Sequence, residues 1–201
     1  AIYPLIEQVE PLEASLQIYG DSYKQGWHEM MAQKLGLKCF ETETDLPLIT
    51  ELEKVLQLVE TDMTIFYRKL AELTPAGDQD EASLLAPLRE AYYQPEALTA
   101  GNREQISNWL RSYLQRVKKD GLNNDERRQR MNTVNPKYVM RNYLAQMAID
   151  KSEEGDHSLV NKLLQVMRKP YAEQPEYEEF VGKRPEWARH RAGCSMLSCS
   201  S

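Results

Sequence analysis

Residues 103–119 read REQISNWLRSYLQRVKK, and their apolar side chains recur every three or four positions. This spacing places them on one face of an α-helix, which then packs against other elements. Lys118 and Lys119 suit the negative end of the helix dipole, and Gly121 suits a helix end. The apolar positions are Ile106, Trp109, Leu110, Tyr113, Leu114 and Val117. The stretch therefore predicts one helix with a buried face.

The same spacing continues upstream. Apolar residues line one helical face over residues 12–35, and Gly36 supplies a stop, although Gly20 and Gly26 weaken the case for an unbroken helix. A second helix is expected to open at Asp45 as N-cap and to continue to Leu70. A shorter helix near residues 84–88 is less regular because Pro87 forbids a normal interior turn.

Downstream, Pro136 is expected to begin a helix that Asn135 caps and that ends at Asp150. A last helix, capped by Asp156, runs to Met167 before Lys169-Pro170 ends it. The side chains expected to point inward from these two helices are Val139, Met140, Tyr143, Leu144, Met147, Ala148, Leu159, Val160, Leu163, Leu164 and Met167.

Beyond Pro170 the composition of the sequence changes. Prolines alternate there with aromatic residues, whose side chains favour burial. No Val/Ile/Thr-rich alternating run predicts a sheet. We therefore expect an all-α protein, an irregular multi-helix bundle with an extended, Pro- and aromatic-rich tail. Residues 1–169 form the helical domain, and residues 170–201 form a tail that packs on the helices.

The composition, with 41% hydrophobic and 28% charged residues, is that of a soluble globular protein. The net charge of −6 argues against nucleic acid as a partner.

No membrane span or targeting signal is visible, and the opening at Ala1 suggests a fragment. The basic residues 126–130 are interpreted as a solvated helix face. Three cysteines are too few for a secreted disulfide framework, which favours the cytoplasm.

No phosphate-binding loop, dinucleotide fingerprint, nucleophile elbow or zinc motif is present in the sequence. The three histidines and the glutamates of the second helix are interpreted as surface, capping or solvated residues rather than a catalytic set. These residues are His28, His157, His190, Glu51, Glu53 and Glu60.

Four residues carry more specific expectations. Arg141 interrupts an apolar helix, so it is expected to hold a buried carboxylate or a loop carbonyl in a structural role. Cys39 is expected to be a packed small hydrophobe. Cys194 and Cys199 are the redox candidates. They lie five residues apart, so they can close a small disulfide loop, Cys199 can reach another part of a larger protein, or its thiol is inert.

Two segments resemble a known family. Residues 135–150, NPKYVMRNYLAQMAID, resemble the Asn-Pro-x-x-Val-Leu-Arg-Asn-Tyr/Trp-Leu-Ala-Gln-x-Ala-Ile segment of the selenoprotein O family. The finish from Pro185-Glu186-Trp187 to Ser198-Cys199-Ser200-Ser201 is similar to that family's C-terminus. The first two-thirds of the chain resemble the family more loosely. Arg184 departs from the family's usual second proline.

The resemblance implies the C-terminal region of a protein adenylyltransferase with a kinase-like fold. Members of this family transfer AMP from ATP, with Mg²⁺ or Mn²⁺, to Ser, Thr or Tyr hydroxyls of proteins. The family's nucleotide- and metal-binding residues precede the matched region, so none is placed on this chain. Cys199 occupies the position that is selenocysteine in many eukaryotic members, which makes it a candidate redox residue.

Two functions follow as hypotheses. In the first, the chain supports the kinase-like N-terminal half of the same protein, carries a redox-responsive tail and is inactive alone. Its partners are then that half and the protein substrates, with no nucleic acid and no membrane, and its catalytic, cofactor and metal residues lie elsewhere. In the second, it is a non-enzymatic helical interaction module.

Overall fold

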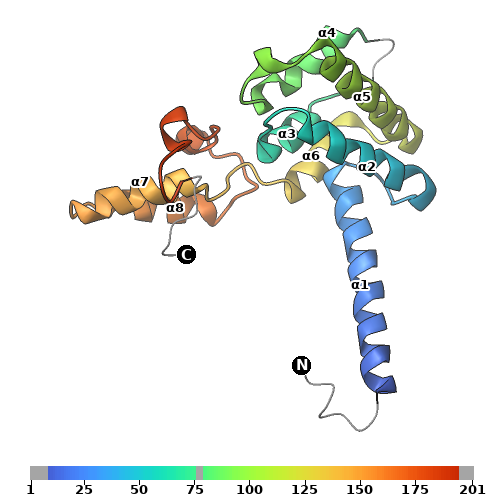
Figure 1. Ribbon diagram of the computed structural model, residues 1–201, viewed down its shortest axis with the longest axis horizontal. Helices are drawn as coiled ribbons and strands as arrows, with labels where there is room; N and C mark the ends of the chain where they lie inside the picture. Colours follow the sequence, from blue (N-terminus) through green and yellow to red (C-terminus); the bar gives the residue numbers. More distant parts are fainter. Residues whose placement is uncertain (1–8, 76–78, 195–201) are drawn as a thin grey trace.

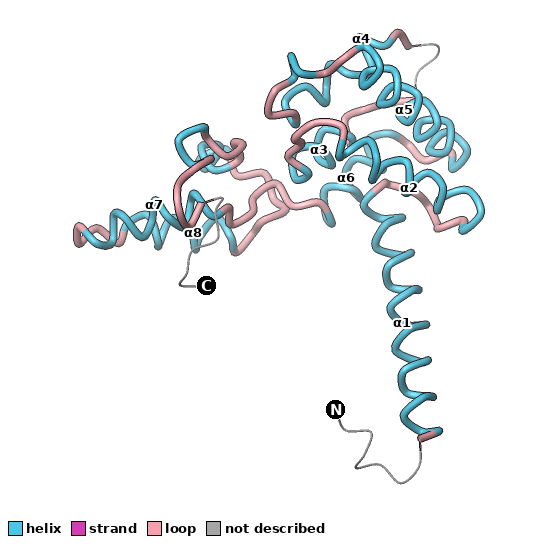
Figure 2. The backbone as a smooth tube through the Cα atoms, viewed as in Figure 1, coloured by secondary structure: helices cyan, strands magenta, loops and turns pink. Residues whose placement is uncertain are grey.

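The computed structural model describes residues 9–75 and 79–194, and these form an all-α fold (Figure 1), as predicted. Figure 2 shows helices joined by loops, with no strand in the part of the chain that is described. The α-helices are α1 (Glu10–Lys34), α2 (Thr42–Gln57), α3 (Met63–Leu70), α4 (Glu81–Leu85), α5 (Ala100–Asp120), α6 (Asn124–Val134), α7 (Asn142–Glu153) and α8 (Ser158–Met167). Short 3-10 helices are η2 (Ala86–Ala91), η3 (Pro95–Ala97), η4 (Pro175–Phe180) and η5 (Glu186–Ala188). None of the described helices is both long and apolar enough to cross a membrane.

Helix α5 confirms the helix predicted over residues 103–119. The hydroxyl of Thr99 caps it by accepting the N–H of Asn102 at 3.1 Å, and Gly121 ends it at a φ of 64°. The predicted apolar face is buried, and the rings of Trp109 and Tyr113 stack on it with centroids 5.4 Å apart. This face forms the centre of a first hydrophobic cluster, which spans Met31 to Met131 and draws on α1 to α6.

The second predicted helix is two helices, α2 and α3, so the expectation of one continuous helix is wrong. Residues 58–62 leave the helix because their backbone pairs with a distant segment. Asp62 N–H donates to Ala91 O at 2.8 Å, and Tyr93 N–H donates to Glu60 O at 3.0 Å. The carboxylate of Asp62 then caps α3 by accepting the N–H of Ile65 at 3.0 Å.

The helix expected to begin at Pro136 does not form there, because α6 ends at Val134 and α7 begins only at Asn142. Long-range hydrogen bonds hold the segment between them. The backbone N–H groups of Lys137 and Tyr138 both donate to Pro170 O, at 2.8 and 3.0 Å. The buried amide of Asn135 donates to Lys34 O at 2.9 Å instead of capping a helix.

A second hydrophobic cluster spans Tyr138 to Cys194 and joins α7 and α8 to the residues that follow them. Phe180 of η4 is buried in it, but Tyr171 and Trp187 are largely exposed, so the tail aromatics are buried only in part. Several helix residues expected to point inward are exposed instead: Met140, Met147, Val160 and Leu164. The domain boundary expected at residues 169/170 stays a prediction. The first hydrophobic cluster ends at Met131 and the second begins at Tyr138, so the division between the two clusters lies earlier in the chain.

Helix α1 is unbroken through Gly20 and Gly26, although these glycines weakened the case for a continuous helix. Gly36 ends it with a φ of 68°, as the sequence predicted. Its C-terminal end joins the first cluster through Met31 and Ala32. Figure 1 shows the rest of α1 projecting away from the other described helices.

Candidate functional site

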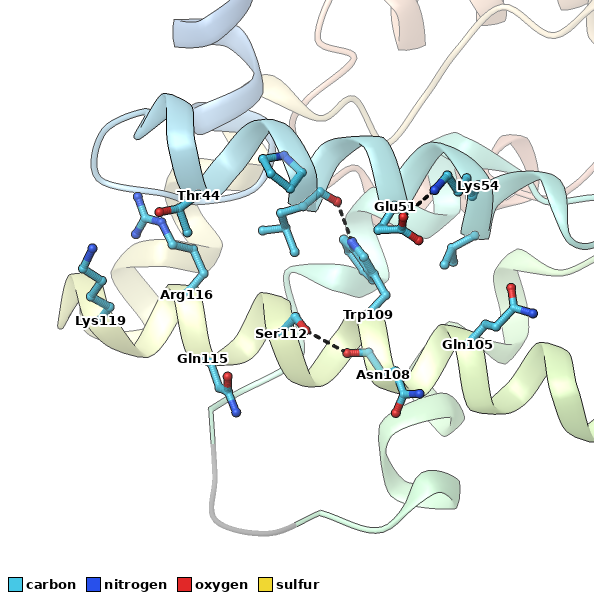
Figure 3. Close-up of a pocket in the computed structure, with 13 residues that line it drawn as sticks. Thr44, Glu51, Lys54, Gln105, Asn108, Trp109, Ser112, Gln115, Arg116 and Lys119 are labelled. Carbon is cyan, nitrogen blue, oxygen red and sulfur yellow. Dashed lines mark hydrogen bonds and ion pairs between the residues drawn. The ribbon is translucent and has the colours of Figure 1, made fainter.

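Helices α2 and α5 lie side by side and enclose a groove of about 680 Å³ (Figure 3). Its floor is apolar, with Leu48, Val55 and the indole of Trp109, whose N–H donates to Leu48 O at 2.8 Å. Polar side chains form the rim: Thr44, Glu51, Lys54, Gln105, Asn108, Ser112, Gln115 and Lys119. This arrangement suits an apolar group that is framed by hydrogen-bonding partners.

Arg116 lies buried at one end of the groove, and its donors are taken up within the protein. Its Nε is 2.7 Å from Asp45 Oδ1, its Nη1 is 2.6 Å from Asp120 Oδ1, and its Nη2 donates to Cys39 O at 2.9 Å. Burial acts to lower the pKa of Arg116, but hydrogen bonds to Asp45 and Asp120 raise it overall. Because its fork is filled by carboxylates and a carbonyl, Arg116 is a structural cation rather than a phosphate ligand.

The buried pair of Asp45 and Arg116 was missed at the sequence level. Asp45 is not the N-cap of α2. It lies inside the first turn and accepts the N–H of Glu41 at 2.7 Å. A signal was present, since Arg116 follows Trp109 and Tyr113 at i+7 and i+3 and so continues the buried face of α5. A cation on such a face requires a buried partner.

Ion pairs link the part of the chain that holds the first cluster to the part that holds the second. We call these residues the polar junction, and its members are Asp62, Arg68, Arg141, Glu173 and Glu60. Arg141 Nη1 lies 2.6 Å from Asp62 Oδ2, which confirms that Arg141 holds a buried carboxylate. Arg68 of α3 pairs with Glu173 and donates to the carbonyl of Asn135 at 3.4 Å. The junction therefore joins α3 to the segments before α7 and after α8.

Glu60 forms the outer part of the junction. Its carboxylate is exposed, as expected, but it lies 2.7 Å from Arg184 and 2.9 Å from Arg189. Partial burial acts to raise the pKa of Glu60, and the hydrogen bonds from Arg189 and Arg184 lower it overall. Beside it, the ammonium of Lys183 donates to Tyr92 O.

Arg127 corrects the interpretation of residues 126–130 as a solvated face, because its side chain is fully buried. Neutral groups accept its hydrogen bonds: Nη1 donates to Tyr113 Oη at 2.9 Å, and Nη2 donates to the carbonyls of Ala71 and Leu73. Burial raises the pKa of Tyr113 to about 12, against the effect of Arg127. Arg128 does point to solvent and pairs with Asp125. Arg127 thus ties α6 to α5 and to the end of α3.

The two described thiols differ in their surroundings. Cys194 is buried in the second cluster, and Cys199 lies outside the described residues. Cys39 is exposed, so the expectation that it packs as a small hydrophobe is wrong. Its carbonyl faces Arg116, which fixes the backbone and leaves the thiol outside.

The histidines do not come together. His28 is half-buried and stacks on Phe40, with ring centroids 4.1 Å apart. His157 and His190 are exposed. Across residues 9–75 and 79–194, no group of three or more His, Cys, Asp or Glu side chains is placed to hold a metal ion.

The described residues form an all-α module whose helices are joined by buried ion pairs. A family model described as "Protein adenylyltransferase SelO" matches residues 1–168. The chain therefore belongs to the SelO family. This finding confirms the resemblance carried by residues 135–150.

Similar curated proteins support the same family assignment. The chain is 50% identical to "Protein nucleotidyltransferase YdiU" of Rhodopirellula baltica, and 46% and 47% identical to proteins of the same name from Flavobacterium johnsoniae and Aromatoleum aromaticum. Each match covers all of this chain but only 39%, 38% and 37% of the respective relative. The chain thus spans less than two fifths of the length of these relatives.

Proposed function

We propose that this chain is the C-terminal helical part of a SelO-family protein adenylyltransferase that acts in the cytoplasm. The complete enzyme transfers AMP from ATP to Ser, Thr or Tyr hydroxyls of proteins. The helical part supports the kinase-like part, which binds ATP and Mg²⁺ or Mn²⁺. The observation that carries the proposal is the match of the whole chain to nucleotidyltransferases that are more than twice as long.

Arg116 and Arg127 both bind groups of the chain itself, which favours a structural role for this part over phosphate binding. Phosphate is usually held by the free forks of arginine or by backbone N–H groups. Here the fork of Arg116 is filled by Asp45 and Asp120, and that of Arg127 by Tyr113 and two carbonyls. Both side chains bind helices together, which is what a rigid support for a neighbouring domain requires.

The test is an AMP-transfer assay with radiolabelled ATP and Mn²⁺. The chain alone is expected to incorporate no AMP into itself or into a generic protein substrate, while the intact Rhodopirellula baltica relative serves as the positive control. Labelling by the chain above the background of a heat-denatured sample contradicts the proposal. A helical interaction module unrelated to nucleotidyl transfer is not favoured, because the family model covers most of the chain.

The redox role of the tail is a separate part of the proposal. Oxidation of Cys199 is expected to change the activity of the intact enzyme, as the position of this thiol in the family resemblance suggests. The experiment compares Cys199→Ser with the parent enzyme under oxidant and under reductant. Cys39→Ser is the matched control, since Cys39 is an exposed thiol elsewhere in the chain. Equal responses of Cys199→Ser and its parent remove the redox role.

A further inference from the structure

The projecting half of α1 carries large apolar side chains that nothing in the described structure covers. Leu16, Tyr19 and Tyr23 are 62%, 69% and 63% exposed. The two tyrosine rings stack on each other with centroids 6.3 Å apart, but no other described ring contacts them. Figure 1 shows this part of α1 standing clear of the helical body. An exposed apolar face of this kind marks an interaction surface.

Most large apolar residues of α1 share one face. At 100° per residue, they fall within an arc of roughly 120°, whereas the charged residues between Glu10 and Glu29 lie outside it. The members of this arc, which we call the α1 face, are Leu12, Leu16, Tyr19, Gly20, Tyr23, Gly26, Trp27 and Met30. Only Trp27 among them already packs against the first hydrophobic cluster, where its ring contacts Phe40. An amphipathic helix gains most of its stability by burying such a face. The α1 face therefore requires a cover.

Gly20 and Gly26 add an independent observation. Each lies in the interior of the helix, where glycine is about 0.5–1 kcal/mol less favourable than alanine. A Cβ built at either position meets nothing within 4 Å, so no contact inside the described chain requires a glycine there. The close approach of a partner's backbone is the usual reason for glycine on a packing face.

We infer that the α1 face is the surface on which the rest of a SelO-family chain docks, and this inference rests on the proposed function. The relatives carry roughly three fifths of their length beyond the part that this chain matches. That large part has to adjoin this module, and the α1 face offers it an apolar stripe with two glycine notches. Acidic residues flank the stripe, so the docking surface on the other side has a basic rim. They are Glu10, Glu13, Asp21 and Glu29, against one lysine, Lys24, over the same stretch.

The experiment co-expresses this chain with a tagged form of the part of the Rhodopirellula baltica relative that the chain does not match, and measures co-purification. The unaltered chain is expected to co-purify. Leu16→Asp and Tyr23→Asp are expected to reduce recovery at least about tenfold, as for residues central to an interface. Ile18→Asp is the matched control, because Ile18 is 66% exposed and lies on the same helix outside the α1 face. It is expected to co-purify as the unaltered chain does.

The outcomes separate this inference from the proposed function. If the unaltered chain does not co-purify, both fail. If Leu16→Asp and Tyr23→Asp co-purify as well as Ile18→Asp does, the proposed function stands and the α1 face is not the docking surface. A concentration-dependent dimer of this chain in light scattering, abolished by Leu16→Asp, assigns the face to a second copy and overturns the inference. Circular dichroism of each variant confirms that helix content is unchanged.

Gly20→Ala tests the close approach. In the chain alone, alanine is expected to raise the melting temperature, because it favours the helix and meets no neighbour. In the co-purification, the same variant is expected to be recovered less well than the unaltered chain. A more stable chain that binds equally well rules out a backbone contact at Gly20.

Discussion

Arg141 Nη1 lies 2.6 Å from Asp62 Oδ2, and this ion pair joins the N-terminus of α3 to the segment that precedes α7. Both side chains are largely buried, and Arg141 Nη2 also donates to Asp62 Oδ1 at 3.2 Å. The pair therefore has the bidentate geometry in which arginine binds carboxylates most strongly. It connects the first hydrophobic cluster to the second.

Replacing Asp62 by asparagine is expected to lower the free energy of unfolding by about 2–4 kcal/mol, because Arg141 is left buried without its carboxylate. Urea denaturation followed by tryptophan fluorescence measures the change. Asp80→Asn is the control, since Asp80 also caps a helix, by accepting the N–H of Ser83, but is exposed. Asparagine caps nearly as well as aspartate, so the control is expected to leave the free energy of unfolding almost unchanged. Equal effects of the two substitutions contradict a role for the ion pair.

Gly36→Ala is expected to destabilise the protein much more than Gly121→Ala. Both glycines have positive φ, 68° and 64°, so alanine is strained by about 1–2 kcal/mol at either position. A Cβ at Gly36 also meets Arg127 Cγ and Met131 Sδ, each at 2.7 Å, whereas a Cβ at Gly121 meets nothing within 4 Å. The additional loss at Gly36 is expected to be about 1–3 kcal/mol, as for an overpacked core. Similar melting temperatures for the two variants show that the Arg127 side chain can move away.

Local periodicity predicted the helices well, because burying one face of α5 requires nothing beyond the spacing of neighbouring residues. It could not predict the breaks at residues 58–62 and 135–141. Those breaks depend on backbone hydrogen bonds to Ala91 and Pro170, which are far away in the sequence. A pattern of side chains contains no information about such partners.

The buried cations show the same limit. Arg141 was recognised because it interrupts an apolar run, and the structure supplies the expected carboxylate. Arg127 was missed because its oxygen acceptors, two carbonyls and a tyrosine hydroxyl, lie outside its own helix, which contributes only the sulfur of Met131. The exposed α1 face was predicted as a helical stripe, but the sequence does not say that the stripe lacks a cover within the described chain.

Acid is expected to weaken the junction at Glu60. The pKa of Glu60 in the folded protein is lower than the ordinary value of 4.5, so its contribution to stability is fully present above pH 4.5. That contribution is lost as the pH falls through the lower, folded value. The melting temperature of Glu60→Gln is therefore expected to be about 2 °C below that of the parent at pH 7, a small effect because the carboxylate is partly exposed. The difference closes as the pH falls below the folded pKa.

The control for the acid experiment is Glu51→Gln, since Glu51 pairs with Lys54 within α2 and not across the junction. Its effect at pH 7 is expected to be smaller than that of Glu60→Gln. A difference between Glu60→Gln and the parent that persists unchanged in strong acid shows that the substitution acts through something other than the charge of Glu60.

The two described thiols are expected to react at very different rates. In a Cys199→Ser background, an aromatic disulfide reagent should label Cys39 at once, because it is exposed, and Cys194 slowly, because it is 5% exposed within the second cluster. The rate at Cys194 should be lower by at least about a hundredfold, since exposure requires a local opening of roughly 3 kcal/mol.

Adding Cys39→Ser should remove the fast phase, and denaturant should make both thiols reactive. Equal rates in the folded protein contradict the burial of Cys194. If the slow phase is found, a disulfide between Cys194 and any other thiol forms only after the second cluster opens.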